Sequence, residues 1–217
     1  MFEYKGIKII WLGHDGFLIK GKKTICIDPF KIERQDKADI LLISHEHYDH
    51  LNIDDIKKVV TPETTVVASK QSIPQLSKLK VKSLKSIIPG QEEIVEGINI
   101  RAVPAYNVNK FQSPGRPFHP KQNEKVGYVV TMDGVKIYHT GDSDFIPEMK
   151  DLKPDIALLP VSGTYVMTAE EAVEAVKAIK PKVAIPMHYA SIVGRWEDAW
   201  TFKKLAPCKV EVLDKNT

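Results

Sequence analysis

Three histidines and one aspartate lie within six residues of one another: His45, His47, Asp49 and His50. Imidazole and carboxylate groups suit zinc, iron and manganese, and four of them in six positions make a chance surface cluster a poor alternative. The run follows residues 40–43, an apolar stretch typical of a buried strand. In an extended or turning backbone His45 and His47 point the same way, whereas Asp49 and His50 point elsewhere. This split predicts two adjacent metal ions, an arrangement that activates water and binds the attacking and leaving oxygens.

The spacing His45-x-His47-x-Asp49-His50 after an apolar strand resembles the signature of the metallo-β-lactamase superfamily of metal-dependent hydrolases. The chain is most similar to a small, single-domain, hydrolase-like subgroup related to the lactonase-like members. The resemblance implies an α/β (α+β) fold, the four-layer αββα sandwich, formed by residues 1–217 as one domain. The residue pattern alone indicates only mixed α and β structure.

Two further positions match the metal ligands that this superfamily places later in the chain. Asp142 follows the strand-like run 135–139 at a Gly-Asp turn and resembles the carboxylate that bridges both metals. His188 ends the apolar run 183–187 and resembles the last ligand. Without the resemblance, Asp142 is an ordinary turn aspartate and His188 a core histidine. Their order in the chain favours the ligand interpretation.

The remaining ligand position departs from the usual pattern, because Asn107 stands where the superfamily places a histidine. An amide oxygen is a weak donor for zinc, so a site with two imidazoles would bind its ion loosely. His119, twelve residues further on, is the candidate helper. It would serve as a third ligand or as a substrate contact, and an exposed loop histidine is the alternative.

The resemblance implies two divalent ions, zinc with manganese and iron as alternatives, that share a bridging hydroxide. This hydroxide would cleave a small ester, lactone, amide or phosphodiester. Asp49 would bind the second ion and orient or deprotonate the water, which makes it the candidate catalytic residue. His50 and His188 would complete the second site, and Asp142 would hold both ions.

Two other classes of function remain alternatives. The first is a di-iron redox protein, although related superfamily members carry a glutamate where this chain has His47, which favours zinc or manganese over iron. The second is a non-catalytic binding module whose metal site is incomplete at Asn107. Weak retention of metal would be its sign.

The segment 104–125 lacks periodicity, is rich in proline and is long for a loop in a compact domain. We expect it to cover the metals, with Arg116 and Lys121 contacting an anionic group of the substrate. A solvated surface loop is the alternative. His14 would reach the mouth of the site or serve as a structural turn residue, and His139 would orient a ligand.

Composition agrees with an ordinary globular protein, with 43% hydrophobic and 27% charged residues among 217. The 31 basic and 28 acidic residues form no basic block, so nucleic-acid binding is not supported and a small-molecule substrate is expected. No stretch is long enough to cross a bilayer, and the start lacks a secretory signal pattern, so we expect a cytoplasmic location. Nothing in the sequence specifies an oligomeric state.

Short apolar runs predict a chain rich in strands, with helices between them. The expected strands are 8–12, 17–20, 24–28, 39–44, 65–68, 98–103, 126–131, 135–139, 155–160, 183–187 and 209–213. The clearest helix is 169–179, where Thr168 and Glu171 form a capping box. Further helices are expected over 54–60 and 197–205, and residues 132–134 indicate a hairpin.

Overall fold

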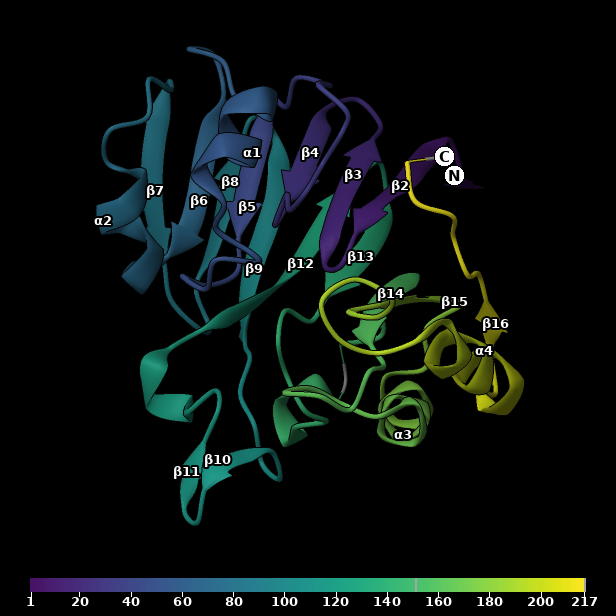
Figure 1. Ribbon diagram of the computed structural model, residues 1–217. Helices are drawn as coiled ribbons and strands as arrows, with labels where there is room; N and C mark the ends of the chain where they lie inside the picture. The colour runs from purple at the N-terminus through teal and green to yellow at the C-terminus, as the bar shows by residue number, and fades with distance from the viewer. Residues whose placement is uncertain (151, 217) are drawn as a thin grey trace.

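Two seven-stranded β-sheets pack against each other in the computed structural model, which describes residues 1–150 and 152–216 (Figure 1). The first sheet contains, in order across it, β1 (Phe2–Tyr4), β2 (Ile7–Gly13), β3 (Gly16–Lys20), β4 (Thr24–Ile27), β5 (Ile40–Ile43), β6 (Thr65–Ser69) and β7 (Ser83–Ile87). Neighbours from β1 to β4 are antiparallel, whereas β4 to β7 are parallel.

The second sheet contains, in order, β16 (Lys209–Val210), β15 (Val183–Met187), β14 (Ile156–Pro160), β13 (Val135–His139), β12 (Val126–Met132), β9 (Ile98–Pro104) and β8 (Glu92–Val95). Neighbours from β13 to β16 are parallel and the others antiparallel. A separate hairpin, β10 (Phe111–Ser113) and β11 (Arg116–Pro117), extends away from the two sheets (Figure 1). Short 3₁₀ turns lie at Lys70–Ser72, Lys121–Asn123 and Pro147–Met149.

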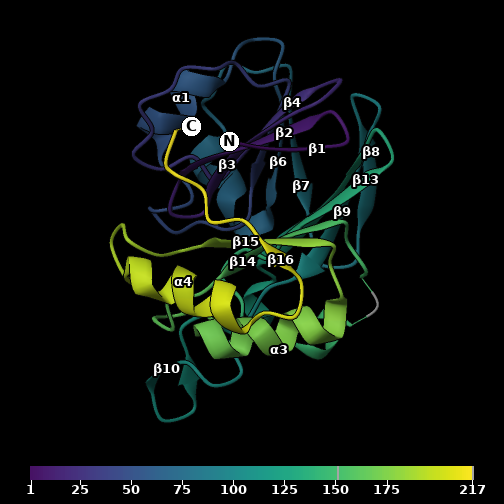
Figure 2. The ribbon, with the colours of Figure 1, turned by 90° about the vertical axis from the view of Figure 1, so that its right-hand side faces the viewer.

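Helices cover the outer face of each sheet. The helices α1 (Ile53–Val59) and α2 (Ile73–Leu76) lie on the first sheet. On the second sheet α3 (Ala169–Ile179) and α4 (Trp196–Leu205) lie side by side (Figure 2). The four-layer αββα order expected from the resemblance is therefore confirmed. In the described part of the chain, no helix combines the length and the apolar character needed to span a membrane.

Strand β5 is apolar throughout because both of its faces are buried. Successive side chains of a strand point to opposite faces of the sheet. Ile40 and Leu42 pack into the core between the sheets, whereas Leu41 and Ile43 pack beneath α1. All four side chains are fully buried. The residues that follow this strand are thus carried on a rigid element, and they include the histidine run.

Most of the secondary structure expected from the sequence is confirmed. The eleven expected strands are present, with β16 shorter than expected, and the helix ends differ by at most one residue. Thr168 and Glu171 form the capping box, and the hairpin between β12 and β13 turns through Asp133 and Gly134, both at positive φ. The elements that the sequence missed are β1, β7, β8, α2 and the β10–β11 hairpin within the expected loop.

Candidate metal centre

The candidate ligands lie at one edge of the sandwich, where strand ends and connecting loops meet. His45 follows β5, Asp142 follows β13 and His188 follows β15. The backbone N–H of His188 donates a hydrogen bond to the carbonyl of His14 at 3.1 Å, which joins the β2–β3 turn to the second sheet. His14 and His188 have φ angles of 51° and 58°, a strained conformation for residues other than glycine. Such strain is found at functional sites, where the surrounding fold enforces it.

One group of donors is built around the first two histidines of the run. The donor atoms of His45, His47, His119 and Asp142 lie within 4.8 Å of one another. Asp142 Oδ2 lies 3.3 Å from His119 Nε2 and 3.8 Å from His45 Nε2. Ligands bonded to one zinc ion at about 2.0–2.2 Å lie roughly 3.0–3.6 Å apart, so a small movement would complete a shared site. The fold thus brings a third imidazole to His45 and His47.

The Asn107 side chain positions His119 through hydrogen bonds and does not point an oxygen of its own at the donor group. Asn107 Oδ1 accepts hydrogen bonds from the backbone N–H of His119 at 2.8 Å and from its ring Nδ1 at 2.9 Å. The Nδ1 proton is then committed, so the Nε2 lone pair faces Asp142 and can bind a metal. Burial lowers the pKa of His119 to about 4, which keeps the ring neutral. The geometry therefore favours His119 over Asn107 as the third ligand.

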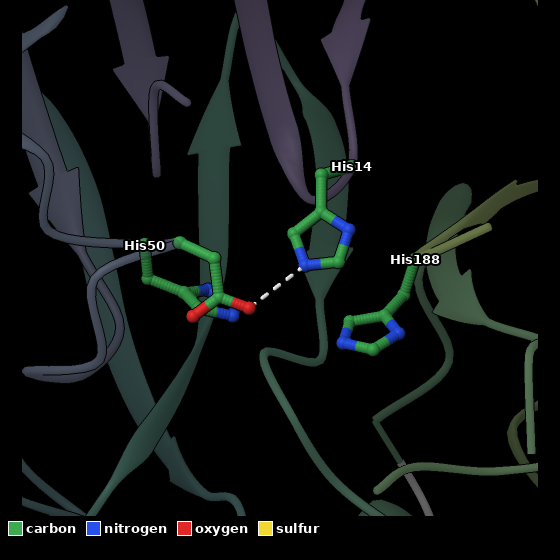
Figure 3. A group of neighbouring side chains, drawn as sticks. His14, His50 and His188 are labelled. Carbon is green, nitrogen blue, oxygen red and sulfur yellow. Dashed lines mark hydrogen bonds and ion pairs between the residues drawn. The ribbon is translucent and has the colours of Figure 1, made fainter. Parts of the chain in front are cut away.

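Two overlapping groups of donors lie on the other side of Asp142. One contains His14, Asp49, His50 and His188, and the other contains Asp15, His50, Asp142 and His188, with donor atoms again within 4.8 Å of one another. Figure 3 shows His14, His50 and His188 turned toward the same region from segments far apart in the sequence. Asp142 belongs to groups on both sides.

Several buried nitrogen and oxygen atoms of these residues have no hydrogen-bond partner among the described residues, which bears on whether the residues fit metal ions. Among the described residues, no hydrogen-bond partner is found for His45 Nε2, His50 Nε2, His188 Nε2 or Asp142 Oδ1, all of which are buried. Buried polar atoms are almost always paired, and exceptions call for an explanation such as an ion. Because the unpaired atoms are nitrogens and oxygens that suit divalent transition metals, the residues fit such ions.

The opposite nitrogens of these rings are already engaged. His50 Nδ1 lies 2.9 Å from Asp28 Oδ2, His188 Nδ1 lies 3.0 Å from Ser162 Oγ, and His45 Nδ1 lies 3.0 Å from Ser44 Oγ. Such contacts orient a metal-binding ring and leave its other nitrogen free. They support Nε2 as the coordinating atom of each ring.

Several of these supporting residues were missed from the sequence. The Asp28 carboxylate also accepts a hydrogen bond from the Ser44 backbone N–H at 2.8 Å. Its place at the end of an expected strand, before Pro29, was the available signal. Lys125 was missed as well: its Nζ is buried 2.9 Å from His47 Nε2 and 3.4 Å from Glu46 Oε1. No local pattern marks such partners, because tertiary packing brings them together.

The electrostatics of the cluster balance buried imidazoles against buried carboxylates. Burial alone would lower the pKa of His188, but the charges of Asp15 and Asp142 offset it and raise the pKa to about 9. Burial would likewise raise the pKa of Asp49, but the hydrogen bond from His14 and the charge of His50 lower it to about 2. Asp49 is therefore a carboxylate at neutral pH.

A pocket of about 440 Å³ opens beside the donors. Its polar lining residues are His47, Asp49, Gln112, His119 and Asp142, and its apolar or aromatic ones are Tyr48, Phe118, Tyr165 and Ile192. The Phe118 and Tyr165 rings meet edge to face with their centroids 4.6 Å apart. Phe118 and His119 come from the segment expected to cover the metals, so part of that segment does form the wall of the pocket.

Three residues were expected to contact the substrate, and the structure places none of them in the lining of this pocket. Arg116 is exposed on β11 and is not among the described residues that line the pocket. The Lys121 ammonium pairs with Glu148 at 2.6 Å, and Lys121 does not line the pocket. His14 is fully buried, and its Nε2 lies 3.1 Å from Asp49 Oδ2, so it belongs to the donor cluster and not to the mouth. His139 lies behind the cluster, with its Nε2 2.9 Å from the Asp15 carbonyl oxygen.

Comparison with known proteins agrees with this architecture. Residues 8–188 match the model of the β-lactamase superfamily domain. A metal-dependent hydrolase of Thermoplasma acidophilum is 35% identical, over 93% of this chain and 92% of its own length. A crystal structure of a metal-dependent hydrolase from Parabacteroides distasonis is 32% identical, with a TM-score of 0.83, and the match covers 95% of this chain and 92% of that one. A metallo hydrolase from Ignicoccus hospitalis, at 23% identity and a TM-score of 0.77, shares the fold. The chain therefore belongs to the metallo-β-lactamase superfamily of metal-dependent hydrolases.

Proposed function

We propose that this protein is a hydrolase that binds two divalent metal ions side by side and cleaves a small ester, lactone, amide or phosphodiester. The observation that carries the proposal is the place of Asp142, which belongs to donor groups on both of its sides. A carboxylate in this position can bind two ions at once. His45, His47 and His119 would hold the first ion, and Asp49, His50 and His188 the second.

When bound, the two ions would supply a nucleophile from water at neutral pH and polarise the scissile bond. The chain contributes the groups that direct this chemistry. Asp49 lines the pocket as a carboxylate, and its Oδ2 accepts a hydrogen bond from His14. We assign to Asp49 the orientation of the attacking water and the uptake of its proton, with His14 holding the carboxylate in place.

The pocket favours an uncharged, apolar substrate group. Tyr48, Phe118, Tyr165 and Ile192 form its apolar wall, and no lysine or arginine appears among its described lining residues. Apolar walls with a few polar groups are typical of sites for small organic ligands. We therefore rank carboxylic esters, lactones and amides with an apolar substituent above phosphodiesters. This replaces the expectation of an anionic substrate group bound by Arg116 and Lys121.

The donor chemistry also bears on the redox alternative. The first group offers three imidazoles and one carboxylate, a set that suits zinc and, in the absence of a second carboxylate, is less suited to a di-iron centre. His47 is one of these three imidazoles, which also favours zinc over iron. Because His119 offers a third imidazole to the first site, the alternative of a non-catalytic binding module with an incomplete metal site is less favoured.

A substrate panel tests the proposal. The protein is loaded with zinc or manganese and assayed on aryl esters, lactones, aryl amides and a bis-aryl phosphodiester. We expect turnover of an ester or lactone, and Phe118→Ala should raise KM for the bulkier apolar substrates about tenfold by removing part of the wall. Phe111→Ala is the matched control, because Phe111 lies on β10 outside the pocket lining. Absence of turnover on every ester, lactone and amide would reject the hydrolase proposal for these classes.

A further inference from the structure

Gln112 lines the pocket without being a candidate metal ligand. The other polar residues among the described lining, His47, Asp49, His119 and Asp142, all belong to the donor groups. Gln112 comes instead from β10, in the hairpin that extends away from the two sheets (Figure 1). Neither the sequence motif nor the comparisons assign it a role.

The pairing of the hairpin makes Gln112 an extra residue on its strand. Phe111 lies opposite Pro117 and Ser113 lies opposite Arg116, so two steps along β10 correspond to one step along β11. Such a β-bulge leaves one residue without a partner on the opposite strand and redirects its side chain, and bulges are common beside active sites. Of the three residues of β10, the bulged one is the residue that lines the pocket.

The base of the hairpin is fixed to the rest of the protein. The Phe118 N–H donates a hydrogen bond to the Lys110 carbonyl at 3.1 Å. The Lys110 ammonium lies 2.7 Å from Glu171 Oε2 in the first turn of α3, and the Lys110 side chain is only 14% exposed. The Asn109 N–H donates to Asp144 Oδ2 at 3.1 Å. The backbone that carries Gln112 is therefore in place before a ligand binds, which lowers the entropy cost of a contact with it.

The Gln112 carboxamide is available to a ligand. Its side chain makes no hydrogen bond with any described residue. A carboxamide offers two N–H donors and a carbonyl acceptor and carries no charge. Because no lysine or arginine appears among the described lining residues, the pocket provides no counter-charge for an anionic group. The group that suits Gln112 is therefore polar and uncharged.

We propose that Gln112 is a specificity-determining residue that hydrogen-bonds a second polar group of the substrate, an uncharged amide or hydroxyl remote from the bond that is cleaved. This inference rests on the proposed hydrolase function and narrows its substrate class. The substrate would be an ester, lactone or amide whose apolar part carries a further amide or hydroxyl. The apolar wall, which includes Phe118 and Tyr165, would contact the apolar part, and Gln112 would select among substrates of similar size.

The exposure of Gln112 sets the size of the expected effect. A hydrogen bond between two uncharged groups changes affinity by roughly three- to tenfold. A substrate without the second polar group would leave Gln112 in contact with water, because the residue is exposed. The contact should therefore appear as a preference between substrates and not as a requirement for activity. Since it lies away from the reacting bond, it should change KM more than kcat.

Gln112→Leu tests the proposal, because leucine is of similar size and has neither a donor nor an acceptor. The matched control is Gln122→Leu, the same exchange at an exposed position outside the described pocket lining. The metal-loaded proteins are assayed on p-nitrophenyl hexanoate and on the same ester with a hydroxyl or an acetamido group at successive positions of the acyl chain. Binding of the corresponding carboxylic acids is measured by calorimetry, which requires no turnover.

The wild-type protein should prefer at least one substituted ligand to the plain one. Gln112→Leu should raise KM for that ester and Kd for that acid roughly three- to tenfold, with the plain ligand within about twofold, and Gln122→Leu should change neither. No preference in the wild type, or an equal effect of Gln112→Leu on plain and substituted ligands, would overturn the proposal. A preference in acid binding that Gln112→Leu removes, without turnover of any ester, would support the contact and count against the proposed hydrolase function instead.

Discussion

Replacing Asn107 with alanine should weaken metal binding and lower stability, although Asn107 is not itself a proposed metal ligand. The side chain accepts hydrogen bonds from His119 N and Nδ1, and its amide donates to the Tyr165 carbonyl at 2.8 Å. Three hydrogen bonds at about 1 kcal/mol each predict a loss of about 3 kcal/mol in the free energy of unfolding. The His119 ring would also lose the contact that fixes its tautomer, and partners of this kind typically contribute 10–100-fold to metal affinity.

The assay combines chelator competition for metal affinity with urea unfolding for stability. Asn107→Asp is the informative companion, because a carboxylate keeps both acceptor contacts to His119 but places an oxygen where the Asn107 amide donates to the Tyr165 carbonyl. We expect Asn107→Asp to retain metal affinity within about threefold and to lose about 1–3 kcal/mol of stability. The matched control is Asn109→Ala, since Asn109 is exposed and its amide contacts Glu171. Metal affinity that is unchanged in Asn107→Ala, or equally reduced in Asn107→Asp, would refute this reasoning.

Three further predictions concern stability. Chelation of the bound metal should lower Tm by about 5–10 °C in a thermal melt, since an ion held at 100 times its Kd adds about 2.7 kcal/mol; an unchanged Tm would argue against bound ions. Gly127→Ala should destabilise the fold by about 3 kcal/mol or more in urea, because its Cβ would lie 2.5 Å from the carbonyl oxygen of Thr140; near-neutral stability would contradict this packing. The hydrogen bond from Arg34 and the contact with Lys20 lower the pKa of Asp36 to about 2. Its stabilisation is therefore complete above the ordinary pKa and is lost as the pH falls toward 2, so Asp36→Asn should cost about 0.5–1 kcal/mol at pH 6 and less at pH 3; an equal cost at both values would exclude the ion pair as its source.

The parts of the fold that the sequence predicted are those with apolar periodicity. In buried strands such as β5 and in the amphipathic helix α3, the spacing of the apolar residues along the sequence indicates which side chains are buried. The missed strands β7 and β8 each bury only one residue fully, so their sequences lack that signal. The β10–β11 hairpin, whose residues are almost all exposed, was read as loop for the same reason.

The candidate site divides in the same way. His45, His47, Asp49 and His50 are close in sequence, so their spacing alone indicated a metal motif. The His119 ring is oriented by a hydrogen bond to Asn107, twelve residues earlier. The buried Asp15 carboxylate lies 3.4 Å from His50 Nε2, which comes from a different loop. These relations arise from tertiary packing. Because Asn107 stands where the family places a histidine, the sequence suggested a weakened site, whereas the fold brings a donor atom of His119 within 4.8 Å of those of His45, His47 and Asp142.

The most direct test of the central claim is the metal content per chain, measured by elemental analysis of protein purified without chelator or added metal. The account predicts about two zinc or manganese ions per wild-type chain, and fewer than two in Asp142→Ala, whose side chain belongs to donor groups on both sides. One ion or none in the wild-type protein would contradict the two-ion centre. Two irons would instead support the redox alternative.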